Sequence, residues 1–280
     1  MSRQPETIVE NYSQSNLTET ILAALVSAGK NLDQLSAEDL VAVDEFHVRG
    51  REATVDLAGK LGLDSSMQVL DIGSGIGGAA RYLASVYGCR VTGVDLTEDY
   101  CNTATQLSER VGLANLVAFR QGDALDLPFD QEAFDVVWTQ HAAMNIADKP
   151  RLYREIWRVL KPGGRLAIYD IVAGSGEPII FPVPWAGDGS ISFVASPDGL
   201  QKLLTQIGFR VYSWQDMSPA SRLWSERLSE RLRDSAGPSP IGIHLLLGAE
   251  FKPRILNLIR NLQEERIGVV EAVLERPLAD

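Results

Sequence analysis

The chain has 280 residues, 45% of them hydrophobic, and a formal net charge of −11. This length and apolar content suit one large α/β domain with additions, and the acidic balance argues against a nucleic-acid substrate, because phosphate binding requires a basic surface. Two cysteines, no apolar run near the roughly 18 residues of a membrane span and no signal pattern lead us to expect a cytoplasmic protein.

Residues 1–66 contain helix-compatible segments at 5–12, 18–28 and 52–61. Between the second and third lies the polar stretch EFHVRGR, residues 45–51. One interpretation of this stretch is a solvated linker. The other is that His47 or Arg49 points into a substrate site.

Residues 67–95 carry the most informative pattern of the chain. A short apolar run at 69–72 is followed by Gly73-Ser74-Gly75-Ile76-Gly77-Gly78, a helix-compatible segment at 79–87, a second apolar run at 91–94 and Asp95. Glycines allow a sharp turn and close approach of a ligand to backbone N–H groups. An acid that ends the second strand can accept hydrogen bonds from both ribose hydroxyls. The order therefore predicts a nucleoside site.

The glycine spacing alone is ambiguous, since Gly73, Gly75 and Gly78 also fit the dinucleotide fingerprint. Asp71 separates the two interpretations. A carboxylate two residues before the first glycine would repel a pyrophosphate but can hold a positively charged amino group.

The pattern Asp71, Gly73, Gly75, Gly77 resembles motif I of the class I S-adenosylmethionine-dependent methyltransferases. The amino-acid sequences of several segments are most similar to those of the methyltransferases that act on sarcosine and dimethylglycine. The resemblance implies a Rossmann-like, doubly wound seven-stranded sheet in the order 3-2-1-4-5-7-6 with strand 7 antiparallel. Because such a sheet forms without a preceding segment, we expect residues 1–66 to be an N-terminal helical cap over the cofactor and substrate. The resemblance also implies S-adenosyl-L-methionine as cofactor, bound by Asp71, Gly73, Ser74, Gly75, Gly77, Asp95, Leu96, Asp123, Ala124 and Gln140.

The following segments continue the alternation of helices and strands. Helices are predicted at 98–111 and 150–160 and strands at 116–120, 134–138 and 165–171. His141 comes directly after the fourth strand. Because ligands bind outside the carboxyl ends of the strands in such sheets, we predict that His141 contacts the substrate.

The C-terminal half departs from the minimal pattern of the family. Residues 172–196 are rich in glycine and proline, and we predict a lid loop whose Phe181 and Trp185 line the substrate site. A helix at 197–207 and a strand at 209–216 follow. Helices at 221–234 and 248–263, the second interrupted near Pro253, form a predicted insertion at 217–263 before a last strand at 267–274, so that the methyltransferase core spans 67–280.

These features predict a methyltransferase that acts on a small-molecule amine such as sarcosine or dimethylglycine. His141 or His47 would take the proton of the acceptor. If the acceptor carries a carboxylate, Arg49 or Arg51 would bind it. O- or C-methylation of a phenol or quinone-like metabolite is the alternative. A nicotinamide-dependent oxidoreductase and a non-catalytic cofactor-binding module are further rivals. We expect no metal, no nucleic-acid partner and no membrane span, and a homodimer stays open.

Overall fold

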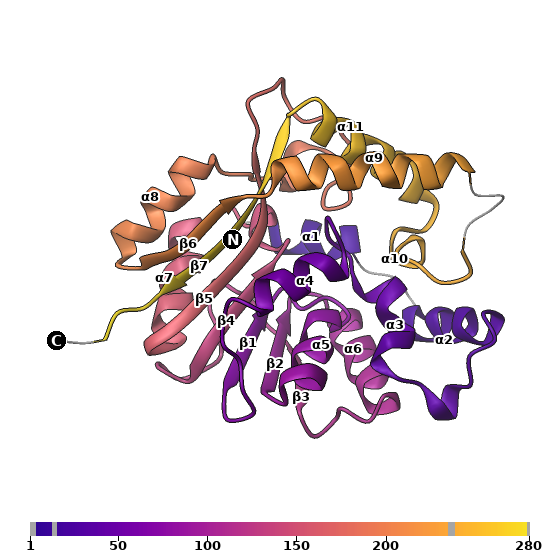
Figure 1. Ribbon diagram of the computed structural model, residues 1–280, viewed down its shortest axis with the longest axis horizontal. Helices are drawn as coiled ribbons and strands as arrows, with labels where there is room; N and C mark the ends of the chain where they lie inside the picture. Colours follow the sequence, from indigo (N-terminus) through magenta and orange to yellow (C-terminus); the bar gives the residue numbers. More distant parts are fainter. Residues whose placement is uncertain (1–3, 13–15, 235–238, 279–280) are drawn as a thin grey trace.

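The computed structural model describes residues 4–12, 16–234 and 239–278. Its core is a seven-stranded sheet in the order β3-β2-β1-β4-β5-β7-β6 (Figure 1), in which β7 is antiparallel to both neighbours and the other pairs are parallel. The predicted fold class and strand order are therefore confirmed. The strands are β1 (Gln68–Ile72), β2 (Arg90–Asp95), β3 (Val117–Gln121), β4 (Phe134–Gln140), β5 (Leu160–Ala173), β6 (Arg210–Asp216) and β7 (Ile267–Glu275).

Alternate residues of the central strands enter two separate hydrophobic clusters. Val69 and Val136 face one cluster, which includes α4 (Arg51–Ala58), α5 (Gly78–Tyr87) and α11 (Phe251–Gln263). Leu70 and Val137 face the other, which includes α7 (Lys149–Val159) and α8 (Pro197–Ile207). Successive side chains of a strand point to opposite faces, so the apolar runs of these strands are buried on both sides, as in other parallel sheets.

The described part of the segment before the sheet contains four α-helices, α1 (Gln4–Tyr12), α2 (Leu17–Ser27), α3 (Ala37–Asp44) and α4. Helix α3 was not among the predicted elements, although Ser36 and Asp39 form a capping box at its start. At its end Asp44 pairs with Arg81 of α5, and both side chains are almost fully buried. A Cβ on Gly78 would lie 2.6 Å from Asp44. Gly78 therefore allows the N-terminal segment to pack against the start of α5.

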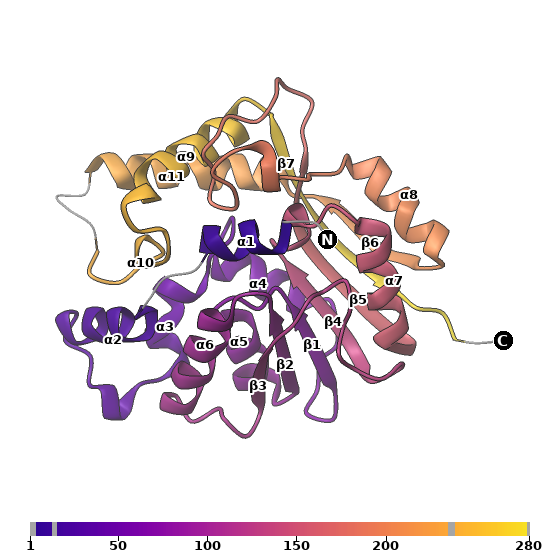
Figure 2. The same cartoon turned by 180° about the vertical axis from the view of Figure 1, so that it is seen from behind.

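The predicted insertion consists of α9 (Ser218–Asp234), α10 (His244–Leu247) and α11. Helix α11 continues through Pro253, contrary to the prediction, because this proline lies in the first turn, where its missing N–H has no helical partner to lose. The break comes earlier, at Gly248, whose φ is 54°. Figures 1 and 2 show α9 and α11 as a layer above α1.

The remaining described elements are α6 (Glu98–Arg110) and the short 3-10 helices η1 (Leu32–Gln34), η2 (Ala143–Asn145), η3 (Gly189–Ile191) and η4 (Gly248–Glu250). Within the described ranges, none of the helices has the length and apolar character needed to cross a membrane.

Candidate active site

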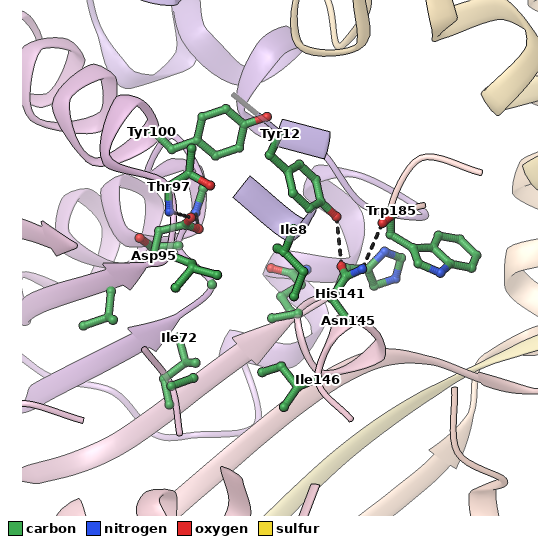
Figure 3. A pocket seen from close by; sticks show the side chains of 18 of the residues that line it. Ile8, Tyr12, Ile72, Asp95, Thr97, Tyr100, His141, Asn145, Ile146 and Trp185 are labelled. Carbon is green, nitrogen blue, oxygen red and sulfur yellow. Dashed lines mark hydrogen bonds between the residues drawn. The ribbon is translucent and has the colours of Figure 1, made fainter. Parts of the chain in front are cut away.

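A cavity of about 350 Å³ opens at the carboxyl ends of β1, β2 and β4. In Figure 3, Asp95 and Thr97 lie at one end of it and His141 and Trp185 at the other, with Ile8 and Tyr12 of α1 between them. The structure thus brings together residues from the glycine turn, the ends of three strands, the lid loop and α1. This is the edge at which open α/β sheets bind their ligands.

The turn after β1 is built for close backbone approach. Gly73 has a φ of 72°, and a Cβ at this position would lie 2.4 Å from Cβ of Ala142, in the chain that leaves β4. A glycine is therefore required on both conformational and steric grounds. Gly73 and Ser74 donate their backbone N–H groups to the carbonyl oxygen of Val94, at 2.8 and 3.2 Å. These bonds hold the turn against β2.

Asp71, one residue before the end of β1, has a carboxylate that is almost fully buried. Its Oδ2 has no hydrogen-bond partner within the protein. Burial, assisted by the charge of Asp95, raises the pKa of Asp71 to about 7. A buried anion without a partner costs free energy, so this carboxylate favours a ligand that brings a positive charge or a hydrogen-bond donor.

Asp95 connects the ends of β2 and the glycine turn. Its Oδ2 accepts a hydrogen bond from the backbone N–H of Gly75 and its Oδ1 accepts one from Thr97, both at 2.9 Å. Burial raises the pKa of Asp95. Farther along the same wall, Asp123 accepts a 2.8 Å bond from the N–H of Leu125 through Oδ1. The two acids are thus fixed in orientation before any ligand binds.

Several other residues that were predicted to bind the cofactor line the cavity. Ser74, Gly75, Leu96, Ala124 and Gln140 all line the cavity. Gly77 is not among the lining residues. Its φ of 86° and the side chain of Phe119, 2.6 Å from a hypothetical Cβ, give it a conformational role at the start of α5.

His141 occupies the end of the cavity away from Asp95. Its φ is 51°, a left-handed conformation that is uncommon for a side chain other than glycine, and its backbone N–H donates to the carbonyl of Tyr169 at 2.8 Å. The side-chain Nε2 is buried without a hydrogen-bond partner. Burial, with a smaller contribution from His47, holds the pKa of His141 well below its usual value. The imidazole is therefore uncharged at neutral pH.

His47 also lines the cavity, but both of its ring nitrogens have partners. Nε2 lies 2.8 Å from Oε2 of Glu45, and Nδ1 lies 3.2 Å from Nε2 of Gln140. Thr54 contacts both His47 and Glu45 through its hydroxyl. This network favours a positioning role for His47 over the base role that the sequence suggested for either histidine.

Two predicted substrate residues lie outside the cavity. Arg49 forms ion pairs with Glu52 and Asp56 at 2.7 and 2.6 Å and is not among the lining residues. The prediction that Arg49 faces the substrate is therefore wrong for this structure, because nearby acids on α4 draw its guanidinium away. Phe181 is likewise absent from the lining and packs against a hydrophobic cluster instead. Trp185 does line the cavity, as predicted.

A cap formed by residues 1–66 was predicted, but not which residues of α1 reach the cavity; these are Pro5, Ile8 and Tyr12. Tyr12 donates a 2.9 Å hydrogen bond to Oδ1 of Asn145, whose Nδ2 donates to the carbonyl of Trp185, also at 2.9 Å (Figure 3). The same Nδ2 donates to the carbonyl of Ile191 at 2.8 Å. The ring of Tyr12 meets Tyr100 edge-on, with the centroids 6.0 Å apart. Helix α1 and the lid loop therefore cover the cavity together. These contacts join segments more than 30 residues apart, which no local pattern could reveal.

Side chains of α11 hold the lid loop. Arg254 donates through Nη1 to the carbonyls of Val183 and Pro184, each at 3.2 Å. Asn257 donates to the carbonyl of Pro182, and Asn261 exchanges two 2.9 Å bonds with Ile180. The described residues contain no group of three or more His, Cys, Asp or Glu side chains arranged to hold a metal ion.

Comparisons with known proteins agree with this geometry. Residues 70–168 match the family model described as "Methyltransferase domain". The chain is 32% identical over 194 residues to the sarcosine/dimethylglycine N-methyltransferase of Halorhodospira halochloris, covering 69% of each chain. It belongs to the class I S-adenosylmethionine-dependent methyltransferases.

A second relative is considerably longer than the match. The glycine/sarcosine/dimethylglycine N-methyltransferase of Actinopolyspora halophila is 33% identical over 230 residues, which are 82% of this chain and 39% of that protein. Among solved structures, the geranyl diphosphate C-methyltransferase of Streptomyces coelicolor A3(2), in complex with Mg²⁺, geranyl diphosphate and S-adenosyl-L-homocysteine, superposes with a TM-score of 0.69 at 18% identity, covering 98% of each chain. This last likeness shows the shared fold.

Membership in the family makes this methyltransferase dependent on S-adenosyl-L-methionine. The cavity fits that cofactor in two independent respects. The unpaired, buried carboxylate of Asp71 matches a ligand with a positively charged amino group, and the glycine turn presents backbone N–H groups where a Cβ would obstruct the approach. The two curated relatives named above carry the names of enzymes that methylate small molecules.

Proposed function

We propose that this methyltransferase acts on a small, mainly apolar acceptor with one ionisable O–H or N–H group, and that His141 receives the proton of that group. A phenol or quinol-like acceptor fits this description best. The observation that carries the proposal is the neutral imidazole of His141, whose Nε2 has no protein partner, in the same cavity as Asp71 and Asp95.

The proposal assigns each end of the cavity a role. Asp71, Ser74 and the turn at Gly73 and Gly75 hold the amino-acid portion of S-adenosylmethionine. Asp95 accepts hydrogen bonds from the ribose hydroxyls, whereas Leu96, Asp123 and Ala124 surround the adenine. Gln140, with Oε1 3.3 Å from Nε1 of Trp138 and Nε2 directed at His47, borders the acceptor.

When bound, the cofactor supplies a methyl group on a sulfonium, which is transferred as its bond to sulfur breaks and a bond to the acceptor atom forms. The contribution of the protein is to hold the reacting atoms in line and close together. The acceptor proton passes to Nε2 of His141. Helix α1 and the lid loop exclude water, which strengthens electrostatic interactions inside the cavity.

The apolar character of the acceptor follows from the wall at the His141 end. Phe46, Met144, Pro184 and Trp185 contribute apolar surface there. Among the described residues that line the cavity, Arg151 is the only arginine or lysine, and its side chain is largely exposed to solvent. Because Arg49 lies outside the cavity, none of the described residues that line its acceptor end is an arginine or lysine that could bind a substrate carboxylate.

A sarcosine- or dimethylglycine-type amine remains the second candidate, because the relatives that match most of the chain carry those names. Such an acceptor must arrive unprotonated, although alkylamines titrate near pH 10, like Lys. Burial would lower the pKa of the amine and His141 could take its proton. The lack of a cation for the substrate carboxylate among the described lining residues of the acceptor end weighs against this candidate.

An acceptor screen with S-adenosylmethionine labelled in the methyl group tests the proposal. Phenols and quinols should be methylated, and glycine, sarcosine and dimethylglycine should react more slowly. The opposite order would establish the amine candidate. In parallel, S-adenosylhomocysteine should raise the melting temperature and NAD should not. Binding without transfer to any acceptor would instead support a non-catalytic module.

A further inference from the structure

A second, smaller cavity lies beside the acceptor end of the main cavity. It has a volume of about 30 Å³, and it shares five lining residues with the main cavity. The shared residues are Phe46, His47, His141, Pro184 and Trp185. The two spaces are therefore neighbours across the histidine that faces the reacting group.

The side chains that line the second cavity are almost all apolar. Of its ten lining residues, all but His47 and His141 are hydrophobic. Both ring nitrogens of His47 already have hydrogen-bond partners, Glu45 and Gln140. A water molecule needs two to four polar partners to occupy such a space, and small cavities lined by apolar side chains stay dry. The space suits a hydrocarbon group.

The far wall of this cavity comes from the segment between β6 and β7. Trp224 lies on α9, Ile243 precedes α10, and Ile255 and Leu258 lie on α11. Two of the side chains flanking Trp224 on its helix, Ser221 and Ser225, are fully buried. The indole of Trp224 therefore projects from the buried side of α9. It closes this end of the cavity.

We propose that the second cavity receives a short alkyl branch of the acceptor, next to the reacting atom, and that Trp224 limits the length of this branch. This inference rests on the proposed function and narrows its substrate class to acceptors that carry a small hydrocarbon substituent beside the methylated position. The volume admits a methyl-sized group. Binding should thus favour one added carbon and gain nothing from a longer chain.

A binding series tests this without requiring turnover. The protein saturated with S-adenosylhomocysteine is titrated by calorimetry with phenol, 2-methylphenol, 2-propylphenol and 2-butylphenol. In the unaltered protein, 2-methylphenol should bind about fourfold more tightly than phenol, the effect of burying one methylene-sized group. The propyl and butyl compounds should bind no better than 2-methylphenol.

Replacing Trp224 by a smaller residue should increase the length of the alkyl substituent that binds most tightly. Trp224→Ala should bind 2-propylphenol or 2-butylphenol most tightly, by at least tenfold over the unaltered protein. Trp214→Ala is the matched control, because Trp214 on β6 packs against the other hydrophobic cluster and lines neither cavity. Its size preference should remain that of the unaltered protein. Leu258→Ala removes less volume from the same wall and should lengthen the best-binding substituent by one carbon. This variant replaces Trp224→Ala in the test if Trp224→Ala does not fold.

The outcomes separate the inference from the proposed function. A size optimum that moves with Trp224, in a protein that methylates none of these compounds, supports the cavity assignment and overturns the phenol-type acceptor. Methylation of phenols with the same size preference in all variants overturns the cavity assignment alone. Absence of binding across the whole series overturns both.

Discussion

The imidazole of His141 lies nearly parallel to the phenol ring of Tyr169, with the centroids 5.6 Å apart and the planes inclined by 11°. His141 directly follows β4, whose last residue, Gln140, pairs with Tyr169 of β5. Tyr169 is fully buried, and burial raises its pKa to about 12 although the charge of Arg49 acts in the opposite direction. A rigid, uncharged ring thus fixes the plane of the proposed base.

The first prediction concerns this stack. Tyr169→Leu should reduce turnover by up to about tenfold, since stacked aromatic pairs contribute roughly 0.5–1.5 kcal/mol beyond their buried area. Tyr169→Phe keeps the ring and should keep most of the activity. The ¹⁵N chemical shifts of His141 across pH, assigned with single variants of the three histidines, provide a second measurement. Equal loss in both variants would show that the hydroxyl, and not the ring, matters.

The second prediction is that His141 acts on the acceptor. His141→Ala should leave the affinity for S-adenosylhomocysteine within about threefold and lower turnover at least tenfold, the low end of the usual contribution of general-base catalysis. The deficit should shrink at high pH, where the acceptor has already lost its proton. Steady-state rates and calorimetry measure the two effects. Loss of cofactor binding in proportion to activity would make His141 a structural residue.

The third prediction uses the raised pKa of Asp71, about 7. The ionised carboxylate attracts the amino group of the cofactor, so affinity for S-adenosylhomocysteine should fall as the pH decreases below 7, approaching tenfold per pH unit. Calorimetry at pH 6, 7 and 8 measures this dependence. Asp71→Asn should bind weakly at every pH, and a pH profile like that of the unaltered protein would exclude Asp71 as the titrating group.

The same carboxylate has the opposite effect on the ligand-free protein. Its pKa in the folded state exceeds the ordinary value of 3.8, so its contribution to stability is full below pH 3.8 and is lost as the pH rises through about 7. Without ligand, Asp71→Asn should therefore melt at a higher temperature than the unaltered protein at pH 8. Calorimetric scans at pH 5 and pH 8 should show this gain mainly at the higher pH.

The fourth prediction concerns Asp95. Two ribose hydroxyls that donate to one carboxylate form charge-assisted bonds worth about 1.5–3 kcal/mol each. Asp95→Ala should weaken cofactor binding by roughly 100-fold, or about 3 kcal/mol. Because Asp95 also accepts bonds from Gly75 and Thr97, circular dichroism must show that the variant is folded. Unchanged affinity in a folded variant would place the ribose elsewhere.

The fifth prediction addresses the buried pair of Asp44 and Arg81. Asp44→Ala leaves the guanidinium of Arg81 buried and charged, which should lower the free energy of unfolding by about 3–5 kcal/mol. Arg81→Met should cost less, because burial already raises the pKa of Asp44 to about 6 and the carboxyl can become neutral, whereas an arginine cannot. Urea unfolding at pH 7 measures both. Equal losses would contradict this asymmetry.

The sequence by itself determined the sheet and the cofactor end of the cavity. The elements from Gln68 to Asp95 follow local rules, since glycine conformations, strand alternation and an acid at a strand end act within about 30 residues. A parallel sheet then brings the carboxyl ends of its strands to one edge. The sequence therefore sufficed to predict that Asp71, Asp95 and His141 share a cavity.

The tertiary structure alone decided the acceptor end. Arg49 is an exception, because its partners Glu52 and Asp56 are only three and seven residues away in the chain. Tyr12 and Trp224 reached the site from helices far away in the chain, through hydrogen bonds and packing that carry no local signature. Side-chain contacts across long sequence separations depend on how whole elements pack, and so the wall that selects the acceptor could be read only from the folded chain.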